Sequence, residues 1–502
     1  MRIRFAVAAA LVSVLSIAAC GVTTSSNTPG SSTPGSDTTG SGAAAVAGAK
    51  RPNIVLVMLD DARVDDMPYM PNVQRLIKRP GAVFSRAFLS YPLCCPVRAS
   101  VLTGKYAHNH GVRHVHYPAG SYQKWVESGT HRSTLPVWLR RSGYHTVMIG
   151  KYLNGYRDYV KARYGVRNAP KDPGWSSWKA TLETYNYRKL AIRHRPGGYV
   201  SYEGRYGTHV LNDIAVNVTR TQAANPKPFF MWLSYVAPHV GTPHEPGDPK
   251  LATPHVAKRD RDTFRHLGNV KSPAFNERDV SDKPSHIRNL PRIGPKLAAQ
   301  IRETRQQRVE SLQAVDRGIG RLVTTLRRTG QLKNTVIIFT SDNGYSLGEH
   351  RRPSGKILPY RESLNTPLYI RGPGIPANRH VTQRVSMSID IAPTVLDLAN
   401  VSAPHQMDGV SLYDVIRDPG PRSRPLLVEA WHANGRPQYT GLRGWRYLYV
   451  EHATGEVELY DLVRDPHQLR SRHDDPEYLA ARTQLAAKLA ATRKCDGPTC
   501  RG

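Results

Sequence analysis

The sequence predicts an α/β fold: a large, mixed but mostly parallel sheet flanked by helices, with a smaller C-terminal α+β unit built on an antiparallel sheet. Three continuous apolar runs of strand length, at 54–59, 228–235 and 335–340, are the first observation. None of them alternates polar with apolar residues, which is typical of parallel strands buried on both faces. The second observation is residues 303–326, where apolar side chains recur at the spacing of a helix.

Polar residues follow each apolar run. Asp60 and Asp61 come directly after the first run, His239 comes shortly after the second, and Asp342 and Asn343 follow the third. In sheets of this kind the carboxyl ends of the strands form the functional site. We therefore expect these side chains to lie close together.

The remaining stretches differ in pattern. Residues 445–450 and 457–462 alternate like the strands of a hairpin, and 477–492 predicts a closing helix. The polar, basic stretches 170–206 and 247–295 are weakly periodic, and we interpret them as long excursions around the mouth of the site. The expected organisation is a signal peptide at 1–20, a linker at 21–50, a main domain at 51–420, a C-terminal subdomain at 421–493 and a tail at 494–502.

The composition is that of a folded protein. Of 502 residues, 39% are hydrophobic and 22% are charged, which excludes wholesale disorder and a polytopic membrane protein. Lys and Arg (70) outnumber Asp and Glu (39) and give a formal net charge of +31. Such a charge attracts nucleic acid, anionic lipid or sulfated glycan, but it does not choose among them. Five cysteines in a chain of this length exclude a scaffold built on disulfides.

The N-terminus predicts export. Arg2 and Arg4 precede an apolar run, 5–19, that is too short to span a bilayer. The run ends in Ile-Ala-Ala-Cys-Gly, which resembles a bacterial lipobox and implies a diacylglyceryl group on Cys20. The following residues are mostly Ser, Thr, Gly, Pro and Ala and favour a disordered linker. We expect a protein anchored by lipid to the outer face of a bacterial cell membrane; a plain secretory signal is the alternative.

The candidate nucleophile lies in the stretch 93–112, which reads L-C-C-P-V-R-A-S-V-L-T-G-K-Y-A-H-N-H-G-V. Pro96 favours the first turn of a helix that Gly104 ends, so Cys94 would face free amide N–H groups that attract an anion. Arg98, one turn further on, adds a planar cation suited to an oxyanion. A Cys in this position is also typical of a nucleophile with a lowered pKa. A Cys pair bonded elsewhere is the alternative that this motif alone leaves open.

Cys94-x-Pro96-x-Arg98, followed by Leu-Thr-Gly-Lys at 102–105, resembles the signature of type I sulfatases of the alkaline phosphatase superfamily. The doubled Cys and Tyr-Ala-His-Asn-His are most similar to the N-acetylglucosamine-6-sulfatases and related heparan 6-O-sulfatases. The resemblance covers nearly the whole folded part and implies an alkaline-phosphatase-like fold with a sulfatase catalytic domain at 51–420. Further matches follow in the family's order at 60–61, 150–154, 237–239, 342–344, 355–356, 390–394, 407–412 and 459–462.

The resemblance implies a particular nucleophile. Cys94 would be converted to Cα-formylglycine by a formylglycine-generating enzyme, and the aldehyde would be hydrated to a geminal diol. One hydroxyl attacks sulfur and releases the alcohol, and the second then expels sulfate, whereas a Ser would keep a stable sulfate ester. The implied substrate is a sulfated sugar or glycan of the N-acetylglucosamine-6-sulfate type.

A set of oxygen donors indicates a divalent cation. Asp60, Asp61, Asp342 and Asn343 offer hard ligands without a thiolate or imidazole cluster, which favours Ca²⁺ or Mg²⁺ over Zn²⁺. The resemblance implies Ca²⁺, with Mg²⁺ the less expected ion. The cation would lower the pKa of the attacking diol and polarise a sulfate oxygen.

The resemblance also implies residues that bind sulfate or stabilise the leaving group. Lys151, His239 and Lys356 match the family positions for these roles. Together with the nucleophile and its arginine they give the expected catalytic set: Cys94, Arg98, Lys151, His239 and Lys356.

Three further residues are expected to bind substrate: Asn154, His108 and His244. Many arylsulfatases carry His where this chain has Leu153, and Asn154 is expected to take over part of that task. His244 competes with His239 for one role, because both lie in the same Pro-rich loop.

Two other functions compete with sulfate ester hydrolysis. A phosphonate or phosphodiester hydrolase can use the same nucleophile, and a non-catalytic lipoprotein could bind polyanions through its charge. A binder has no use for ordered carboxylates beside Cys94, so we favour the sulfatase and expect no nucleic acid partner. In the tail, Cys495 and Cys500 could close a short loop by a disulfide.

Overall fold

The computed structural model describes residues 51–168, 170–195, 198–382, 385–418 and 424–501. The predicted signal peptide, the lipid attachment at Cys20 and the linker therefore lie outside the described residues. Within the described ranges, no helix is both long and apolar enough to cross a membrane.

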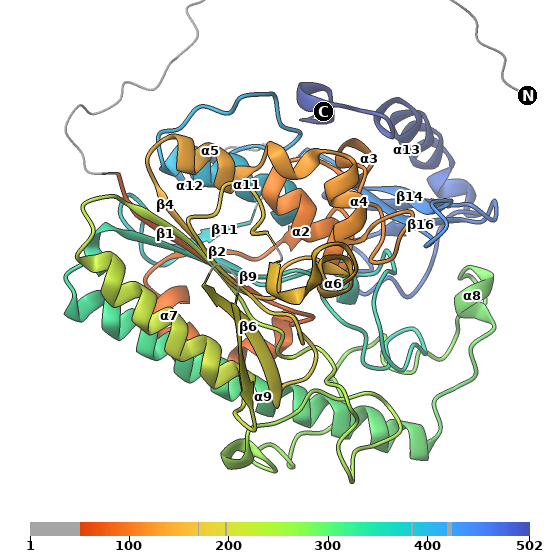
Figure 1. Cartoon of the computed structure of the whole chain (residues 1–502). Helices are drawn as coiled ribbons and strands as arrows, with labels where there is room; N and C mark the ends of the chain where they lie inside the picture. Colours follow the sequence, from red (N-terminus) through yellow and green to blue (C-terminus); the bar gives the residue numbers. More distant parts are fainter. Residues whose placement is uncertain (1–50, 169, 196–197, 383–384, 419–423, 502) are drawn as a thin grey trace, which may run out of the picture. The chain divides into compact units, whose positions relative to one another are not determined.

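An eight-stranded sheet lies at the centre of the described chain (Figure 1). In spatial order its strands are β11 (Arg379–Val381), β2 (Ala82–Phe84), β10 (Leu368–Arg371), β9 (Thr335–Ser341), β1 (Asn53–Leu59), β8 (Phe229–Ser234), β4 (His145–Gly150) and β5 (Ser177–Ala180). The neighbours β9-β1-β8-β4-β5 run parallel, and β10 is antiparallel to both strands beside it. The three apolar runs are β1, β8 and β9, which lie side by side, so the predicted mixed, mostly parallel sheet is confirmed.

Helices cover both faces of this sheet (Figure 1). The helices of the described residues are α1 (Pro71–Val73), α2 (Cys94–Thr103), α3 (Ala107–His110), α4 (Ser121–Glu127), α5 (Leu135–Arg141), α6 (Tyr156–Asn168), α7 (Gly207–Ala223), α8 (Ser285–Arg288), α9 (Pro295–Arg328), α10 (Arg361–Leu364), α11 (Met387–Leu398), α12 (Leu412–Arg417) and α13 (Leu479–Thr492), of which α13 packs on the C-terminal sheet. Leu56 of β1 packs in a core with residues of α2, α5 and α11, whereas Val57 packs with α7 and α9. Because both faces of the strand are buried, its sequence shows no polar alternation.

Short turns of 3-10 or π helix complete the helical elements. They lie at Val64–Tyr69, Gln74–Lys78, Thr130–Arg132, Lys258–Asp260, Leu332–Asn334, Pro476–Tyr478 and Gly497–Arg501.

A second, antiparallel sheet of four strands forms the C-terminal part. Its strands are β13 (Leu426–Trp431), β14 (Pro437–Arg443), β15 (Tyr447–His452) and β16 (Val457–Asp461). The hairpin expected at 445–462 is β15 and β16, which pair Leu448 with Tyr460, and α13 is the expected closing helix. The predicted C-terminal α+β unit is therefore confirmed, and a disulfide between Cys495 and Cys500 closes the loop after α13.

One of the two expected excursions contains more regular structure than its sequence indicates. The stretch 170–206 holds β5 at the edge of the main sheet and a hairpin of β6 (Lys189–Arg195) and β7 (Gly198–Glu203). Trp178 of β5 packs against Tyr152 with ring centroids 4.8 Å apart. This contact between distant segments stabilises β5, and periodicity along the chain could not reveal it. A further short pair joins β3 (Ala87–Phe88) to β12 (Val385–Ser386).

Candidate active site

The carboxyl ends of four neighbouring strands deliver the polar residues of the site. Asp60 follows β1, Lys151 follows β4, His239 lies shortly after β8, and Asp342 follows β9. The register of β1 and β9 places Leu59 opposite the last residue of β9, so the residues after the two strands are neighbours. The backbone N–H of Asp342 donates to the Leu59 carbonyl at 3.1 Å. The parallel topology thus brings the polar strand ends to one edge of the sheet.

Helix α2 brings Cys94 to the same edge. The helix begins at Cys94, carries Pro96 in its first turn and ends at Gly104, as the sequence predicts. Gly104 has a left-handed φ of 71°, and a Cβ there would lie 2.4 Å from the sulfur of Met407. Both constraints favour glycine at this position. The helix therefore ends at Gly104. Cys94, at its start, is buried (2% exposed).

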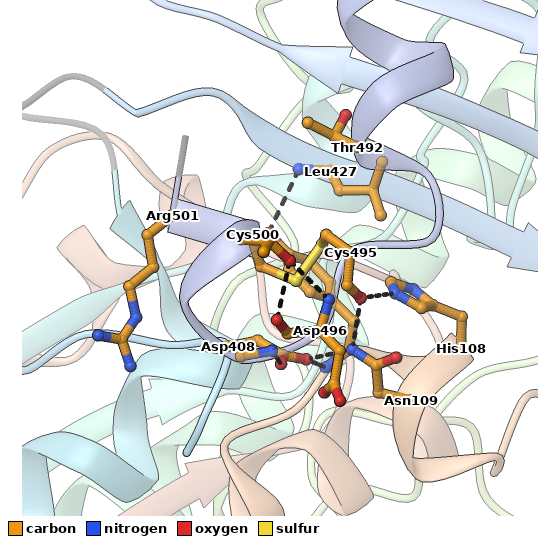
Figure 2. The surroundings of a disulfide bond; sticks show 12 residues. His108, Asn109, Asp408, Leu427, Thr492, Cys495, Asp496, Cys500 and Arg501 are labelled. Carbon is orange, nitrogen blue, oxygen red and sulfur yellow. Dashed lines mark hydrogen bonds between the residues drawn. A yellow bond between two sulfur atoms is a disulfide. The ribbon is translucent and has the colours of Figure 1, made fainter.

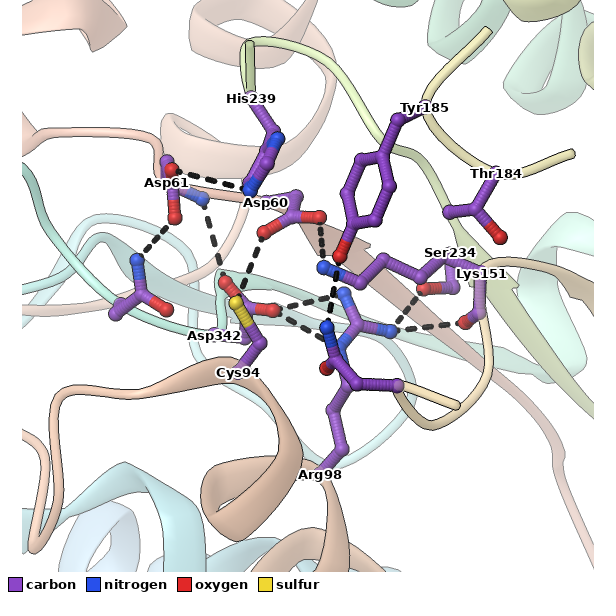
Figure 3. Close-up of polar contacts among 12 residues, drawn as sticks. Asp60, Asp61, Cys94, Arg98, Lys151, Thr184, Tyr185, Ser234, His239 and Asp342 are labelled. Carbon is purple, nitrogen blue, oxygen red and sulfur yellow. Dashed lines mark hydrogen bonds and ion pairs between the residues drawn. The ribbon is translucent and has the colours of Figure 1, made fainter. Parts of the chain in front are cut away.

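Charged side chains of both signs surround Cys94, and Figure 3 shows Asp60, Asp342 and Lys151 among them. Asp60 Oδ1 lies 3.5 Å from Cys94 Sγ, and the other oxygen of Asp60 accepts a hydrogen bond from Lys151 Nζ. Lys356 Nζ lies 2.9 Å from Cys94 Sγ and also binds Asp61 Oδ1. The sulfur therefore contacts one carboxylate and one ammonium group, and each of these pairs with a further charged side chain of the cluster.

The oxygen donors of this cluster fit a divalent cation. Asn343 Nδ2 donates to Asp61 Oδ1, and the backbone N–H of Asp61 donates to Asp342 Oδ1 at 3.3 Å. Asn343 is fully buried, and its Oδ1 has no hydrogen-bond partner among the described residues. A buried acceptor without a partner is unusual in proteins and is available as a metal ligand. Asp60, Asp61, Asp342 and Asn343 together offer the hard oxygen set that Ca²⁺ or Mg²⁺ requires.

Arg98 links several residues of the site through its guanidinium group. Its side chain is fully buried, Nε donates to Asp342 Oδ2 at 2.8 Å, and Nη2 lies 2.8 Å from the same oxygen. Nη1 donates to the Lys151 carbonyl at 2.8 Å and to Ser234 Oγ at 2.7 Å. The expectation that the Arg98 guanidinium faces an oxyanion is therefore corrected. The guanidinium instead ties the ends of β4, β8 and β9 to one another.

Burial dominates the protonation of Cys94 and His239. It raises the pKa of the Cys94 thiol to about 12, although the positive charges of Lys151 and Lys356 act in the other direction. The expected lowering of this pKa is wrong, and an unmodified Cys94 is protonated at neutral pH and a weak nucleophile. Burial also lowers the pKa of His239 to about 3, against the opposing effect of Asp61.

Tyr185 is a residue of the site that the sequence did not indicate. Its ring stacks on His239 with centroids 4.5 Å apart, and Lys151 Nζ lies 5.0 Å from the ring centroid (Figure 3). Its hydroxyl accepts a hydrogen bond from Asn154 Nδ2 at 2.8 Å. The only signal in the sequence was the position of Tyr185 in a stretch expected at the mouth of the site.

Arg308 is the second residue that the sequence did not single out. It lies on α9, is fully buried, and binds the backbone carbonyl of Asp61 and that of Pro238, the latter at 3.2 Å. Burial raises the pKa of Asp61, but Lys356, His239 and Arg308 together hold it well below its usual range. The helical pattern predicted α9, but it does not distinguish Arg308 from the other polar residues of the helix.

Two expected substrate-binding residues contact other parts of the chain. His108 Nδ1 bonds to Glu429 Oε2 at 2.8 Å. Its Nε2 bonds to the Cys495 carbonyl, also at 2.8 Å (Figure 2). Because both ring nitrogens are used, His108 fixes the C-terminal tail instead of binding substrate. His244 is exposed and bonds to a backbone carbonyl of its own loop at 2.8 Å. His239, with Nε2 3.8 Å from Asp61 Oδ2, is the histidine of this loop that joins the cluster.

Comparison of sequences shows the family. The sequence model "Sulfatase" matches residues 52–401, and the model "N-sulphoglucosamine sulphohydrolase, C-terminal" matches residues 348–495. An arylsulfatase of Volvox carteri is 33% identical over 91% of this chain and 76% of its own length. An N-acetylglucosamine-6-sulfatase of Capra hircus is 31% identical over 91% of this chain and 86% of its own length.

Solved structures share the fold. A protein solved in complex with its substrate D-glucosamine-2-N,6-O-disulfate has a TM-score of 0.68 and 23% identity, covering 89% of this chain and 98% of that chain. The phosphonate monoester hydrolase of Agrobacterium radiobacter has a TM-score of 0.65 and 22% identity, covering 88% and 95%. The matched family model defines the class of the protein as a hydrolase, and its fold is that of these solved structures. Within the hydrolases the chain belongs to the Sulfatase family and is a sulfatase.

Proposed function

We propose that this sulfatase hydrolyses O-sulfate esters of a sulfated sugar or glycan of the N-acetylglucosamine-6-sulfate type. The observation that carries the proposal is the position of Cys94 at the start of α2, between Asp60 and Lys356. Relatives that include an N-acetylglucosamine-6-sulfatase at 31% identity support the choice of substrate class.

The nucleophile in this proposal is Cα-formylglycine, made from Cys94 by a formylglycine-generating enzyme. The hydrate of this group supplies one hydroxyl for attack on sulfur and a second for the release of sulfate. Lys356 Nζ lies 2.9 Å from the sulfur of residue 94, so its positive charge would lie beside the reacting oxygen. Against the effect of burial, Asp60 raises the pKa of Lys151, which stays protonated and stabilises the departing oxygen.

The oxygen donors described above would hold the cation, which we propose is Ca²⁺. When bound, it polarises a sulfate oxygen and favours the ionised form of the nucleophile. Arg98 acts on this site indirectly, because its two contacts with Asp342 Oδ2 fix the direction of that carboxylate. The ring of Tyr185 stacks on His239 and so fixes the plane of the imidazole at the mouth of the cluster.

Mass analysis of the peptide that contains Cys94, from protein made in the native host, tests the nucleophile. The expected result is the mass of an aldehyde in place of the thiol at residue 94, and an unchanged thiol would contradict the proposal. Initial rates with N-acetylglucosamine 6-sulfate, an aryl sulfate and a phosphonate monoester then test the substrate. Faster turnover of the phosphonate than of either sulfate would favour the phosphonate hydrolase instead.

We also propose that the protein is exported and anchored to the outer face of a bacterial membrane by a lipid on Cys20. The apolar run that ends in Ile-Ala-Ala-Cys-Gly and the polar linker after it support this location. Growth with a labelled fatty acid tests the anchor: label should enter the wild-type protein but not Cys20→Ala. Release of an unlabelled wild-type protein into the medium would indicate the secreted alternative.

A further inference from the structure

A cavity of about 630 Å³ lies beside the charged cluster, between α4, α6 and the loop that carries Tyr117. A smaller cavity of about 200 Å³ is lined by Lys151, a member of the cluster. The two cavities have part of their lining in common, so they are neighbours, and Lys151 lines the smaller one. The shared residues are Asn154, Gly155, Asp158 and Tyr185.

The lining that the two cavities share has both an aromatic face and an acceptor without a partner among the described residues. The ring of Tyr185 extends from the cluster, where it stacks on His239, to the larger cavity. Asn154 donates its Nδ2 hydrogen to the Tyr185 hydroxyl at 2.8 Å. Its Oδ1 is buried and has no hydrogen-bond partner within the described ranges. An amide oxygen in this state can accept a hydrogen bond from a ligand hydroxyl.

The outer part of the larger cavity combines aromatic and charged side chains. Tyr117 is 51% exposed, which is unusual for a large aromatic residue of a folded protein. Tyr159 of α6 adds a second ring to the lining, and Asp158 and Arg163 of the same helix add an acceptor and a donor. Aromatic faces suit the C–H faces of a sugar ring, and charged groups suit its hydroxyl edge.

We propose that the 630 Å³ cavity binds a second sugar unit, joined to the unit that carries the sulfate. This inference rests on the proposed function and extends it: the preferred substrate is an oligosaccharide or polysaccharide, not a sulfated monosaccharide or aryl sulfate. The volume of the cavity lies within the range of about 300–1,000 Å³ that is common for ligand pockets. The cavity shares four lining residues with the smaller cavity that Lys151 lines, and in the proposed function Lys151 stabilises the departing sugar oxygen.

Steady-state kinetics with matched substrates test this proposal. The probes are N-acetylglucosamine 6-sulfate and two disaccharides that carry a second sugar on the reducing or the non-reducing side of the same unit. We expect kcat/KM for at least one disaccharide to exceed that of the monosaccharide by about tenfold, which corresponds to about 1.4 kcal/mol. In Tyr117→Ala and in Asp158→Asn, the KM for that disaccharide should rise until most of this preference is lost.

Trp445→Ala is the matched control, because Trp445 is 50% exposed and lines neither cavity. It should keep the wild-type ratio of disaccharide to monosaccharide. A wild-type ratio near one, or a ratio that neither Tyr117→Ala nor Asp158→Asn changes, would overturn the proposal while the function as a sugar sulfatase stands. Turnover of an aryl sulfate without turnover of any of the three sugars would instead overturn the proposed sugar substrate, and this inference with it.

Discussion

Lys356 Nζ lies 2.9 Å from Cys94 Sγ, although 262 residues separate the two positions in the chain. Cys94 is the first residue of α2, whereas Lys356 lies in the segment that follows β9. The same ammonium group binds Asp61, one of the oxygen donors of the cation site. The position of the nucleophile and the cation site are therefore coupled through one side chain.

Replacing Cys94 tests the nucleophile. Cys94→Ala should lower sulfate release by at least about 10³-fold, because no other group offers the second hydroxyl that expels sulfate. The neighbouring thiol provides the control: Cys95 is also fully buried, and Cys95→Ala should keep its turnover. Thermal unfolding of both variants should show a folded protein, and substantial activity in Cys94→Ala would refute the covalent route.

Removal of the cation tests the oxygen donors. Treatment with EDTA followed by gel filtration should abolish activity and lower the Tm, because a ligand bound only to the folded state stabilises it. Added Ca²⁺ should restore both quantities more fully than Mg²⁺. Asp342→Ala should contain less metal by elemental analysis than the wild-type protein, and equal metal content would show that the ligand set is different.

Loss of Arg98 should destabilise the protein. In Arg98→Met the Asp342 carboxylate stays buried without its partner, which costs about 3–5 kcal/mol for a buried ion pair. Urea unfolding in the presence of a chelator measures this cost without compensation by the cation. The double variant Arg98→Met/Asp342→Leu should recover part of the loss, and additive effects of the two changes would contradict the pairing.

Lys151 should matter most for substrates with a poor leaving group. Lys151→Ala removes the cation that stabilises the departing oxygen, so hydrolysis of a sugar sulfate should fall by about 10²–10⁴-fold. Hydrolysis of 4-nitrophenyl sulfate should fall much less, because its leaving group needs little stabilisation. Lys105→Ala is the control, since Lys105 pairs with an exposed carboxylate at 3.5 Å, and equal losses for both substrates would argue against the role of Lys151.

The disulfide of the tail should contribute to stability. A loop of this length confers about 2 kcal/mol in the chain-entropy description, and opening it also frees the Cys495 carbonyl that His108 binds. Cys495→Ser/Cys500→Ser should therefore unfold at lower urea concentration than the wild-type protein. The activity of the double variant at 25 °C should change little, and a large loss would place the tail closer to catalysis than its contacts indicate.

The sequence predicted the positions of the strands and of their polar ends, because burial on both faces leaves a continuous apolar run. Asp60 and Asp342 lie far apart in the sequence, yet the rule for the carboxyl edge of a parallel sheet already brings them together. The start of α2 at Cys94 was equally predictable, since Pro96 and Gly104 mark the two ends of the helix. These are local signals or general rules of topology.

The partners of long side chains were not predictable in the same way. The sequence motif singled out Arg98 but not its partner, and it did not distinguish Arg308 at all. Only the folded chain shows that Arg98 holds Asp342 and that Arg308 holds the Asp61 carbonyl. His108 lies within the family motif, but its nitrogens face Glu429 and the tail. Which groups a side chain reaches depends on packing between segments that are distant in sequence, and no periodicity carries that information.

The burial of Cys94 bears on when its proposed oxidation can take place. With 2% of its surface exposed, the side chain is out of reach of any second enzyme once the chain has folded. The proposed oxidation must therefore precede folding, while residues 93–98 are still extended. A molecule that folds too early would keep its thiol and remain inactive, however well it is made in every other respect.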